Sequence, residues 1–178
     1  MTEQTPKPEA EAPSAEAKQA AASPLNDRGR QTARALQRVA SSFAQESGGR
    51  DDIPWVRLPA ERLHDVAERC KDDRELRMDM LHCLFAVDYV ERIEVDYILV
   101  SIATDRKVML KVDLPPEGSS VGTVTDLWQA ATWFERETHD LFGVTFDGND
   151  DLEPLLLFDG FEGYPGRKSF PLHDYEEW

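Results

Sequence analysis

The chain has 178 residues with 40% hydrophobic side chains, which suits one compact core and leaves little room for two full domains. Its formal net charge of -15 argues against unaided binding to nucleic acid or anionic lipid. The same charge favours basic partner surfaces, or serves solubility alone. The two cysteines, Cys70 and Cys83, form no CxxC pair, so neither a disulfide framework nor a metal ligand set is visible.

The first part of the chain, residues 1–28, is rich in Ala, Pro and Glu and poor in large apolar side chains. Such a composition does not recover the entropy of ordering, so we expect a disordered arm. It lacks the apolar core of a signal peptide, and no later run reaches the roughly 18–20 apolar residues of a membrane span. The sequence therefore predicts a cytoplasmic chain that meets a membrane only through other proteins.

An amphipathic helix is predicted from Arg30, because apolar residues recur on one face at helical spacing. That face holds Leu36, Val39, Ala40 and Phe43. Arg30, Arg34 and Arg38 repeat every four residues on another face, which predicts a solvated row of charges. Gly48 and Gly49 are expected to end the helix.

A strand over residues 53–58 and a second helix that begins after Pro59 are expected next. One face of this helix carries Leu63, Val66, Ala67 and Cys70. His64 lies beside that face and His82 lies in a later apolar stretch. Both are expected to be structural histidines with hydrogen-bond partners.

Three apolar strands follow, over residues 78–87, 95–102 and 107–113, and a hairpin at 104–106 joins the last two. Helices that precede consecutive antiparallel strands are typical of an α+β fold. We therefore predict a two-layer domain with helices on a mainly antiparallel sheet. A further helix and a long extended C-terminal interaction tail should follow it.

The further helix is indicated by Thr123-Val-Thr-Asp126, which has the spacing of a capping box. Residues 118–122 before it predict a loop. The helix should run to about Leu141, where Phe142 and Gly143 close it and the glycine serves as the C-terminal cap.

This helix carries the densest cluster of ionisable side chains in the chain, around Glu135-Arg136-Glu137. Glu135 and His139 are four residues apart and share a helix face, so a soluble metalloenzyme is one hypothesis. Zinc and di-iron sites need three or four ligands, however, and no second ligand motif is visible. Arg136 and Asp140 also share a face and predict an i,i+4 ion pair.

The last part of the chain is the most aromatic, because 11 of the 16 aromatic residues lie in 123–178. Long loops in compact domains are usually functional, disordered or committed to a partner, and so apolar a loop predicts packing along another subunit. Between Phe142 and Trp178, nine carboxylates stand against two strong bases, Arg167 and Lys168. These bases predict either a solvated turn or an anchor to carboxylates across an interface.

Taken in order, the motifs of residues 60–172 resemble the 30 kDa subunit family of respiratory complex I, the NADH:quinone oxidoreductase. The resemblance rests on Glu135-Arg136-Glu137, Asp140, Phe142-Gly143, Gly148, Asp151-Leu152, a leucine-rich stretch, Glu162-Gly163, Pro165, Arg167-Lys168 and Pro171. Val87-Asp88-Tyr89 and Val124-Thr125-Asp126 are also similar to the family. The chain departs from it at Asn149 and Tyr164, where histidines are usual, and at Glu153 and Pro154, where basic residues are usual.

The resemblance implies a non-catalytic, cofactor-free structural and assembly subunit of the hydrophilic arm. It implies FMN, iron–sulfur clusters and quinone in partner subunits. The implied partners are the 49 kDa-type quinone-site subunit and the subunit with the terminal iron–sulfur cluster, without nucleic acid. The implied place is peripheral, on the cytoplasmic side of the plasma membrane. The equivalent subunit of a ferredoxin-fed relative or of a membrane-bound hydrogenase is the alternative hypothesis.

On this basis we expect a core domain over residues 29–142, including the Glu-Arg-Glu helix, and a partner-wrapping tail over 143–178. The residues expected to dock partners or to support docking are Glu135, Arg136, Glu137, Asp140, Phe142, Gly143, Gly148, Gly163, Pro165, Arg167, Lys168 and Pro171. None of them is expected to be catalytic or to hold a metal or cofactor.

Overall fold

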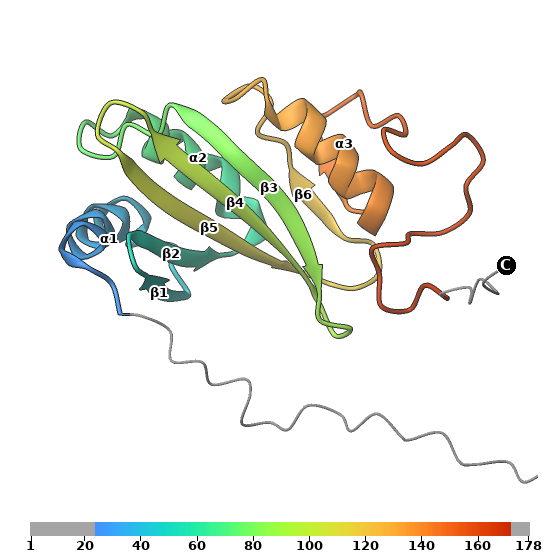
Figure 1. The fold of residues 1–178 in the computed structure, drawn as a ribbon, viewed down its shortest axis with the longest axis horizontal. Helices are drawn as coiled ribbons and strands as arrows, with labels where there is room; N and C mark the ends of the chain where they lie inside the picture. Colours follow the sequence, from blue (N-terminus) through green and yellow to red (C-terminus); the bar gives the residue numbers. More distant parts are fainter. Residues whose placement is uncertain (1–23, 172–178) are drawn as a thin grey trace, which may run out of the picture.

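The computed structural model describes residues 24–171, which form an α+β domain around a five-stranded sheet (Figure 1). The elements are α1 (Asp27–Ala40), β1 (Glu46–Arg50), β2 (Ile53–Leu58), a 3-10 turn η2 (Ala60–Arg62), α2 (Leu63–Asp72), β3 (Met80–Asp88), β4 (Ile93–Ser101), β5 (Arg106–Leu114), β6 (Ser120–Gly122), α3 (Ala131–Phe142) and β7 (Thr145–Asp147). The strand order is β1-β2-β5-β4-β3, and the neighbours are antiparallel except for the parallel pair β2 and β5. The predicted two-layer α+β fold is confirmed.

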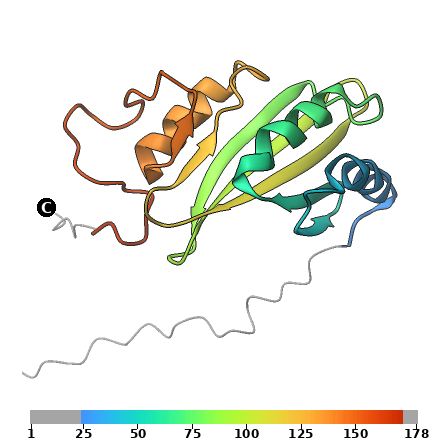
Figure 2. The same ribbon diagram turned by 180° about the vertical axis from the view of Figure 1, so that it is seen from behind.

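The core lies between one face of this sheet and the helices α1 and α2. Along β5, Val108, Leu110 and Val112 are fully buried, and they alternate with half-buried side chains on the other face. α2 lies behind the sheet in Figure 1 and in front of it in Figure 2, whereas the other face carries no helix. No helix within residues 24–171 is long and apolar enough to cross a membrane.

A second, smaller layer follows the main sheet. β6 and β7 pair in parallel, and α3 runs beside the outer strand β3. After β7 the chain forms a loop segment over residues 148–171, which passes around α3 in both views (Figures 1 and 2). Residues 1–23 of the arm predicted over 1–28, and the end of the tail over 172–178, lie outside the described residues. The arm was predicted to extend too far, because Asp27 and Arg28 form the first turn of α1.

Two boundaries near the start of the chain differ from the prediction. α1 ends at Ala40, and Gly48 and Gly49 lie in β1, where they pair with Trp55 and Pro54 of β2. A Cβ on Gly48 would come within 2.6 Å of the Trp55 ring, so the glycine provides space for the indole. The glycines therefore allow close packing between strands and do not cap a helix.

Two boundaries after the sheet differ as well. Residues 118–122 are not only a loop, because Ser120–Gly122 form β6. α3 begins at Ala131 and not at the predicted capping box, because the hydroxyl of Thr123 donates to the buried carboxylate of Glu135 at 2.7 Å. The end of α3 is as predicted, since Gly143 has a φ of 68° and its N–H donates to the carbonyl of His139.

One glycine gives a test of how α1 is packed. Gly29 is buried in α1, and a Cβ there would lie 2.5 Å from the backbone oxygen of Asp51. Gly29→Ala should therefore lower the free energy of unfolding by about 1–3 kcal/mol, although helix propensity alone would raise it by about 0.5–1 kcal/mol. Urea unfolding measures the change. The control is Gly122→Ala, whose Cβ would meet no atom within 4 Å, and equal stability of both variants would contradict the packing.

Candidate functional site

Glu135 is fully buried and joins three segments of the chain. Its Oε1 accepts the backbone N–H of Val124 at 2.9 Å, and its Oε2 accepts the Thr123 hydroxyl at 2.7 Å and the Asn149 side-chain amide at 2.9 Å. Burial raises the pKa of Glu135, and the three hydrogen bonds offset that rise only in part. The carboxylate thus fixes the approach to α3 and the start of the tail.

Arg136 and Asp140 do not form the predicted ion pair. The guanidinium of Arg136 donates to the backbone carbonyls of Glu153 at 3.0 Å and Pro154 at 3.2 Å. The Asp140 carboxylate accepts three consecutive backbone N–H groups, those of Leu155, Leu156 and Leu157, at 3.2, 2.8 and 2.9 Å. The prediction was wrong because an irregular loop has unpaired backbone groups, and these compete for both side chains.

We call this arrangement the backbone clamp, formed by Arg136 and Asp140 on residues 153–157. Burial alone would raise the pKa of Asp140, but the three backbone N–H bonds outweigh burial, so the pKa lies below the ordinary value. Hydrogen bonds to a charged acceptor are stronger than those between neutral groups. The clamp therefore holds a segment that has no helix or strand of its own.

A second attachment lies at Arg167 and Lys168. Arg167 donates from Nε to the carbonyl of Phe142 at 2.6 Å and from its guanidinium to the carbonyl of Pro116, while its charge lies 5.5 Å from the Tyr164 ring centre. The backbone N–H of Lys168 donates to Asp88 at 2.8 Å. Arg167 thus binds carbonyls of its own chain, while the Lys168 ammonium lies 6.0 Å from the Tyr89 ring centre on an exposed residue.

Two glycines let aromatic rings cover the end of α3. A Cβ on Gly143 would lie 2.5 Å from the Tyr164 ring, and one on Gly166 would lie 2.8 Å from the Phe142 ring. The N–H of Gly166 also donates to the carbonyl of Leu141 at 2.9 Å. The segment after α3 therefore returns to the end of the helix that precedes it.

Large apolar side chains are exposed on and beside the clamped segment. Leu156 is 59% exposed and Phe158 70%, while Trp133 on α3 is 60% exposed beside Arg136. Phe158 also meets the ring of Phe161 edge-on at 5.3 Å. We call the exposed side chains of Trp133, Leu156, Phe158 and Tyr164 the tail surface. Large apolar side chains left exposed on an ordered segment indicate an interaction site.

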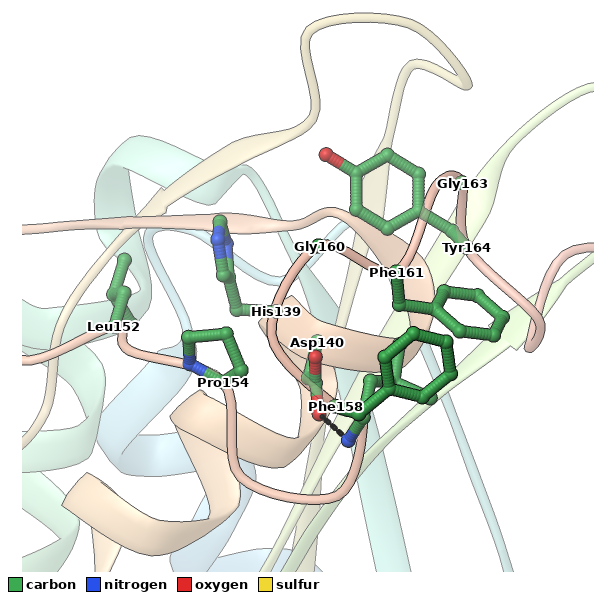
Figure 3. Close-up of a pocket in the computed structure, with 10 residues that line it drawn as sticks. His139, Asp140, Leu152, Pro154, Phe158, Gly160, Phe161, Gly163 and Tyr164 are labelled. Atoms are coloured by element: carbon green, nitrogen blue, oxygen red, sulfur yellow. Dashed lines mark hydrogen bonds between the residues drawn. The ribbon is translucent and has the colours of Figure 1, made fainter.

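A small cavity of about 180 Å³ lies between α3 and the clamped segment (Figure 3). His139 and Asp140 come from the helix, and Phe158, Phe161 and Tyr164 come from the loop around it. The cavity is thus enclosed where the loop after β7 folds back onto α3 of the same chain.

The geometry does not favour the hypothesis that Glu135 and His139 bind a metal ion, because both side chains have other hydrogen-bond partners. Glu135 is occupied by three donors, and the Nδ1 of His139 donates to the carbonyl of Val144 at 2.8 Å. Within residues 24–171, no group of three or more His, Cys, Asp or Glu side chains could hold a metal ion. Glu135 thus joins α3 to residues 123–124 and Asn149, whereas His139 joins the end of α3 to Val144.

The remaining histidines differ from each other. His64 bonds to Asp126 at 2.9 Å, as expected of a structural histidine. His82 is exposed at a register shift between Leu81 and Cys83. Its side chain makes no hydrogen bond within residues 24–171, so the expectation of a hydrogen-bonded structural histidine was wrong.

The other predicted site residues lie along the same segment. Gly148 and Gly163 have φ values of 94° and 92°, which only glycine adopts without strain. Pro165 is half-buried, and Pro171 is exposed at the last described position. Sequence reasoning did not select Asn149, Thr123 and Asp88 as site residues. Their only signal was their place in or near the family-like motifs.

Comparison with known proteins gives a consistent result. Residues 56–176 match the family described as "Respiratory-chain NADH dehydrogenase, 30 Kd subunit". An NADH-quinone oxidoreductase subunit of Erythrobacter litoralis is 43% identical over 125 residues, which are 68% of this chain and 49% of that protein. The subunit of the same name from Roseiflexus castenholzii is 42% identical over 120 residues, which are 66% of this chain and 69% of that protein. The chain thus spans between about half and two thirds of these relatives.

Two solved structures share the fold. A chain of the membrane-bound sulfane sulfur reductase, an archaeal respiratory membrane complex, superposes with a TM-score of 0.70 at 28% identity, over 82% of this chain and 87% of that one. A trypsin-resistant fragment of Nqo5 superposes with a TM-score of 0.56 at 32% identity, over 67% of this chain and 97% of the fragment.

The backbone clamp can be tested by removing its carboxylate. Asp140→Ala should destabilise residues 153–157 locally by about 1.5–3 kcal/mol, the usual worth of hydrogen bonds to a charged group. Chymotrypsin should then cleave beside Leu155–Phe158 about 10–100 times faster, because cleavage follows the open population. Glu137→Gln on the same helix is the control. Unchanged cleavage in Asp140→Ala would show that the clamp does not hold the loop.

The buried carboxylate of Glu135 gives a pH test. Because its folded pKa is raised, its ionisation costs stability as pH rises from the unfolded pKa of about 4.3 through the folded value. Glu135→Gln cannot ionise, so it should gain stability relative to the wild type over that range. For Asp140 the effect is opposite, because its folded pKa is lowered and the ionised carboxylate stabilises the fold. Asp140→Asn should therefore be less stable than the wild type at neutral pH, and the difference should disappear as pH falls through the lowered pKa. Urea unfolding from about pH 2.5 to 7 covers both pH windows, and parallel curves would contradict the assignment.

Proposed function

The chain belongs to the respiratory-chain NADH dehydrogenase 30 kDa subunit family, and from this premise we propose that it is a structural and assembly subunit of a proton-translocating NADH:quinone oxidoreductase. In this role it occupies the peripheral, hydrophilic arm and binds no cofactor of its own. Electrons pass from NADH to quinone through FMN and iron–sulfur clusters in partner subunits.

The observation that carries the proposal is the tail surface on its clamp. Leu156 and Phe158 expose most of their side chains, although the backbone beneath them is held by Asp140 and Arg136. An isolated chain gains nothing from fixing apolar side chains in water. A pre-ordered apolar loop does favour association, because less conformational entropy is lost when the partner binds.

The partners follow from the same surface and from the family. We assign the tail surface to the 49 kDa-type quinone-site subunit and the nearby faces to the subunit with the terminal iron–sulfur cluster. The net charge of -15 favours partners with basic surfaces around these contacts. Contact with the membrane is then indirect, on the cytoplasmic side.

The ionisable cluster supports a structural role and not independent chemistry. The hydrogen bonds of this cluster are made within the chain, by Glu135, Arg136 and Asp140 to backbone or side-chain groups of other segments. A general acid or base must instead reach a substrate proton. The motif therefore builds the surface that the partners bind.

The archaeal sulfane sulfur reductase neighbour supports a second candidate host. Its chain matches over 82% of this sequence, although it belongs to a different respiratory membrane complex. A ferredoxin-fed or hydrogenase-type complex would use the same subunit fold. Affinity purification from membranes separates the candidates, since a flavin and an NADH-oxidising module mark one and a nickel–iron centre marks the other.

The tail surface gives a direct functional test. Leu156→Ser with Phe158→Ser should change the free energy of unfolding of the isolated chain by no more than about 0.5 kcal/mol, because both side chains are exposed. In membranes, the same variant should lower NADH:quinone activity about tenfold or more and reduce the amount of full-sized complex. Native gels and membrane assays measure the two effects.

The matched control is Ile102→Ser, which replaces a side chain that is 71% exposed in the β4–β5 turn. It should leave activity and complex size unchanged. Normal complex in the Leu156 and Phe158 variant, or equal loss in the control, would remove the support for tail docking.

A further inference from the structure

Glu137 is the residue of the Glu-Arg-Glu motif that takes no part in the hydrogen bonds of Glu135 or in the backbone clamp. Within residues 24–171, its carboxylate makes no hydrogen bond or ion pair, although the residue is half-buried. It lies on the wall of a groove of about 160 Å³ between α3 and β3. The Glu137 carboxylate therefore has no positively charged partner within the described residues and can pair with a cation from another subunit.

Apart from Glu137 and Thr138, the groove is lined by apolar side chains and Cys83. Its lining side chains from α3 include Phe134, Leu141 and Phe142, and those from β3 include Cys83 and Phe85. The lining is thus a strip of rings and aliphatic groups with one acidic group. Such a composition suits a partner with one basic side chain among apolar ones.

Two residues that line the groove, Cys83 and Phe85, alternate with the buried Leu84 and Ala86 and so lie on the face of the sheet away from the core. Among the described residues, no helix covers this face (Figure 1). On this face Cys83 lies opposite Ile98, and Phe85 lies opposite Asp96. Val87 and Val100 share the face, and these apolar side chains are half-buried rather than exposed polar ones. From Cys83 to Val87, β3 is thus apolar on both faces, as is typical of strands covered on both sides. β4 differs, because it carries Glu94 and Asp96 on this face, and both pair with Lys111 of β5.

Asp96 lies on the same face of the sheet as the groove, but it is not available to a partner. The residue is 4% exposed, and one of its oxygens accepts from Lys111 at 3.0 Å. The other oxygen is buried without a hydrogen-bond partner in the part of the chain that the structure describes. This oxygen is inaccessible from outside the chain, so a partner on the open face would pair with Glu137 and not with Asp96.

We propose that the groove and the adjoining open face dock an amphipathic helix of a neighbouring subunit, with a Lys or Arg paired to Glu137. Its apolar stripe would lie on Phe85, Ile98 and Leu141. A helix fits better than an added strand, because α3 already lies along the outer edge of β3 and a pleated face packs against helices. This inference rests on the proposed function, since the helix comes from another subunit of the complex.

Cys83 provides the probe, because it is half-buried in the groove, whereas Cys70 is fully buried in the core and serves as the internal reference. The purified complex and the isolated full-length chain are treated with N-ethylmaleimide, and the rate at Cys83 is measured by mass spectrometry. We expect labelling at least about ten times slower in the complex, because interface cores exclude solvent. An equal rate in both would overturn the proposal.

The charge is tested by Glu137→Lys, with Glu68→Lys at an exposed position of α2 as the matched control. Glu137→Lys should remove most of the protection, about tenfold, since like charges across an interface are costly. The control should keep it. Thermal unfolding of both isolated variants confirms that they fold, and protection that survives Glu137→Lys would overturn the pairing.

A maleimide–diazirine cross-linker attached to Cys83 identifies the occupant. A linked peptide from another subunit, with apolar residues at helical spacing and a Lys or Arg among them, supports the proposal. A link to a second copy of this chain, or to a segment without that pattern, overturns it. A complex that forms normally with Cys83 fully reactive refutes only the groove, whereas a chain that purifies without partner subunits refutes the proposed function as well.

Discussion

The backbone clamp on α3 is the interaction on which the second half of the molecule depends. Residues 148–171 contain no helix or strand, so their peptide groups need partners from elsewhere in the fold. Arg136 supplies donors to two carbonyls, and Asp140, one turn later, accepts three N–H groups. The two side chains thus satisfy five backbone groups of a loop. As a surface i,i+4 ion pair they would contribute only about a few tenths of a kcal/mol.

The neighbouring motif residues have complementary roles. Glu135 joins the approach to α3 with Asn149, and Arg167 returns the loop to the end of the helix at Phe142. Together they position apolar side chains outward at a defined place. This arrangement is the physical basis of the proposed structural role, in which the subunit presents an ordered binding surface and its partner subunits hold the redox centres. Glu137 alone is left over, which is why it points to a further contact.

Much of the fold could be predicted from the sequence, because local patterns decide it. The alternation of apolar residues in β5 and the glycine after Phe142 indicated a strand and a helix end that the structure confirms. The roles of Gly48 and of the Arg136 and Asp140 pair could not be predicted. They depend on Trp55 in the next strand and on a loop more than ten residues away, and helical spacing carries no information about either.

If the clamp works as described, α3 orders the tail within the chain itself, before any partner binds. Hydrogen–deuterium exchange of the isolated full-length protein tests this most directly, read at the amides of residues 153–168. We predict slow exchange at Leu155–Leu157, Gly166 and Lys168, whose N–H groups donate to Asp140, Leu141 and Asp88. Exchange at the rate of an unstructured peptide throughout this segment would contradict it, and would mean that only the partner orders the tail.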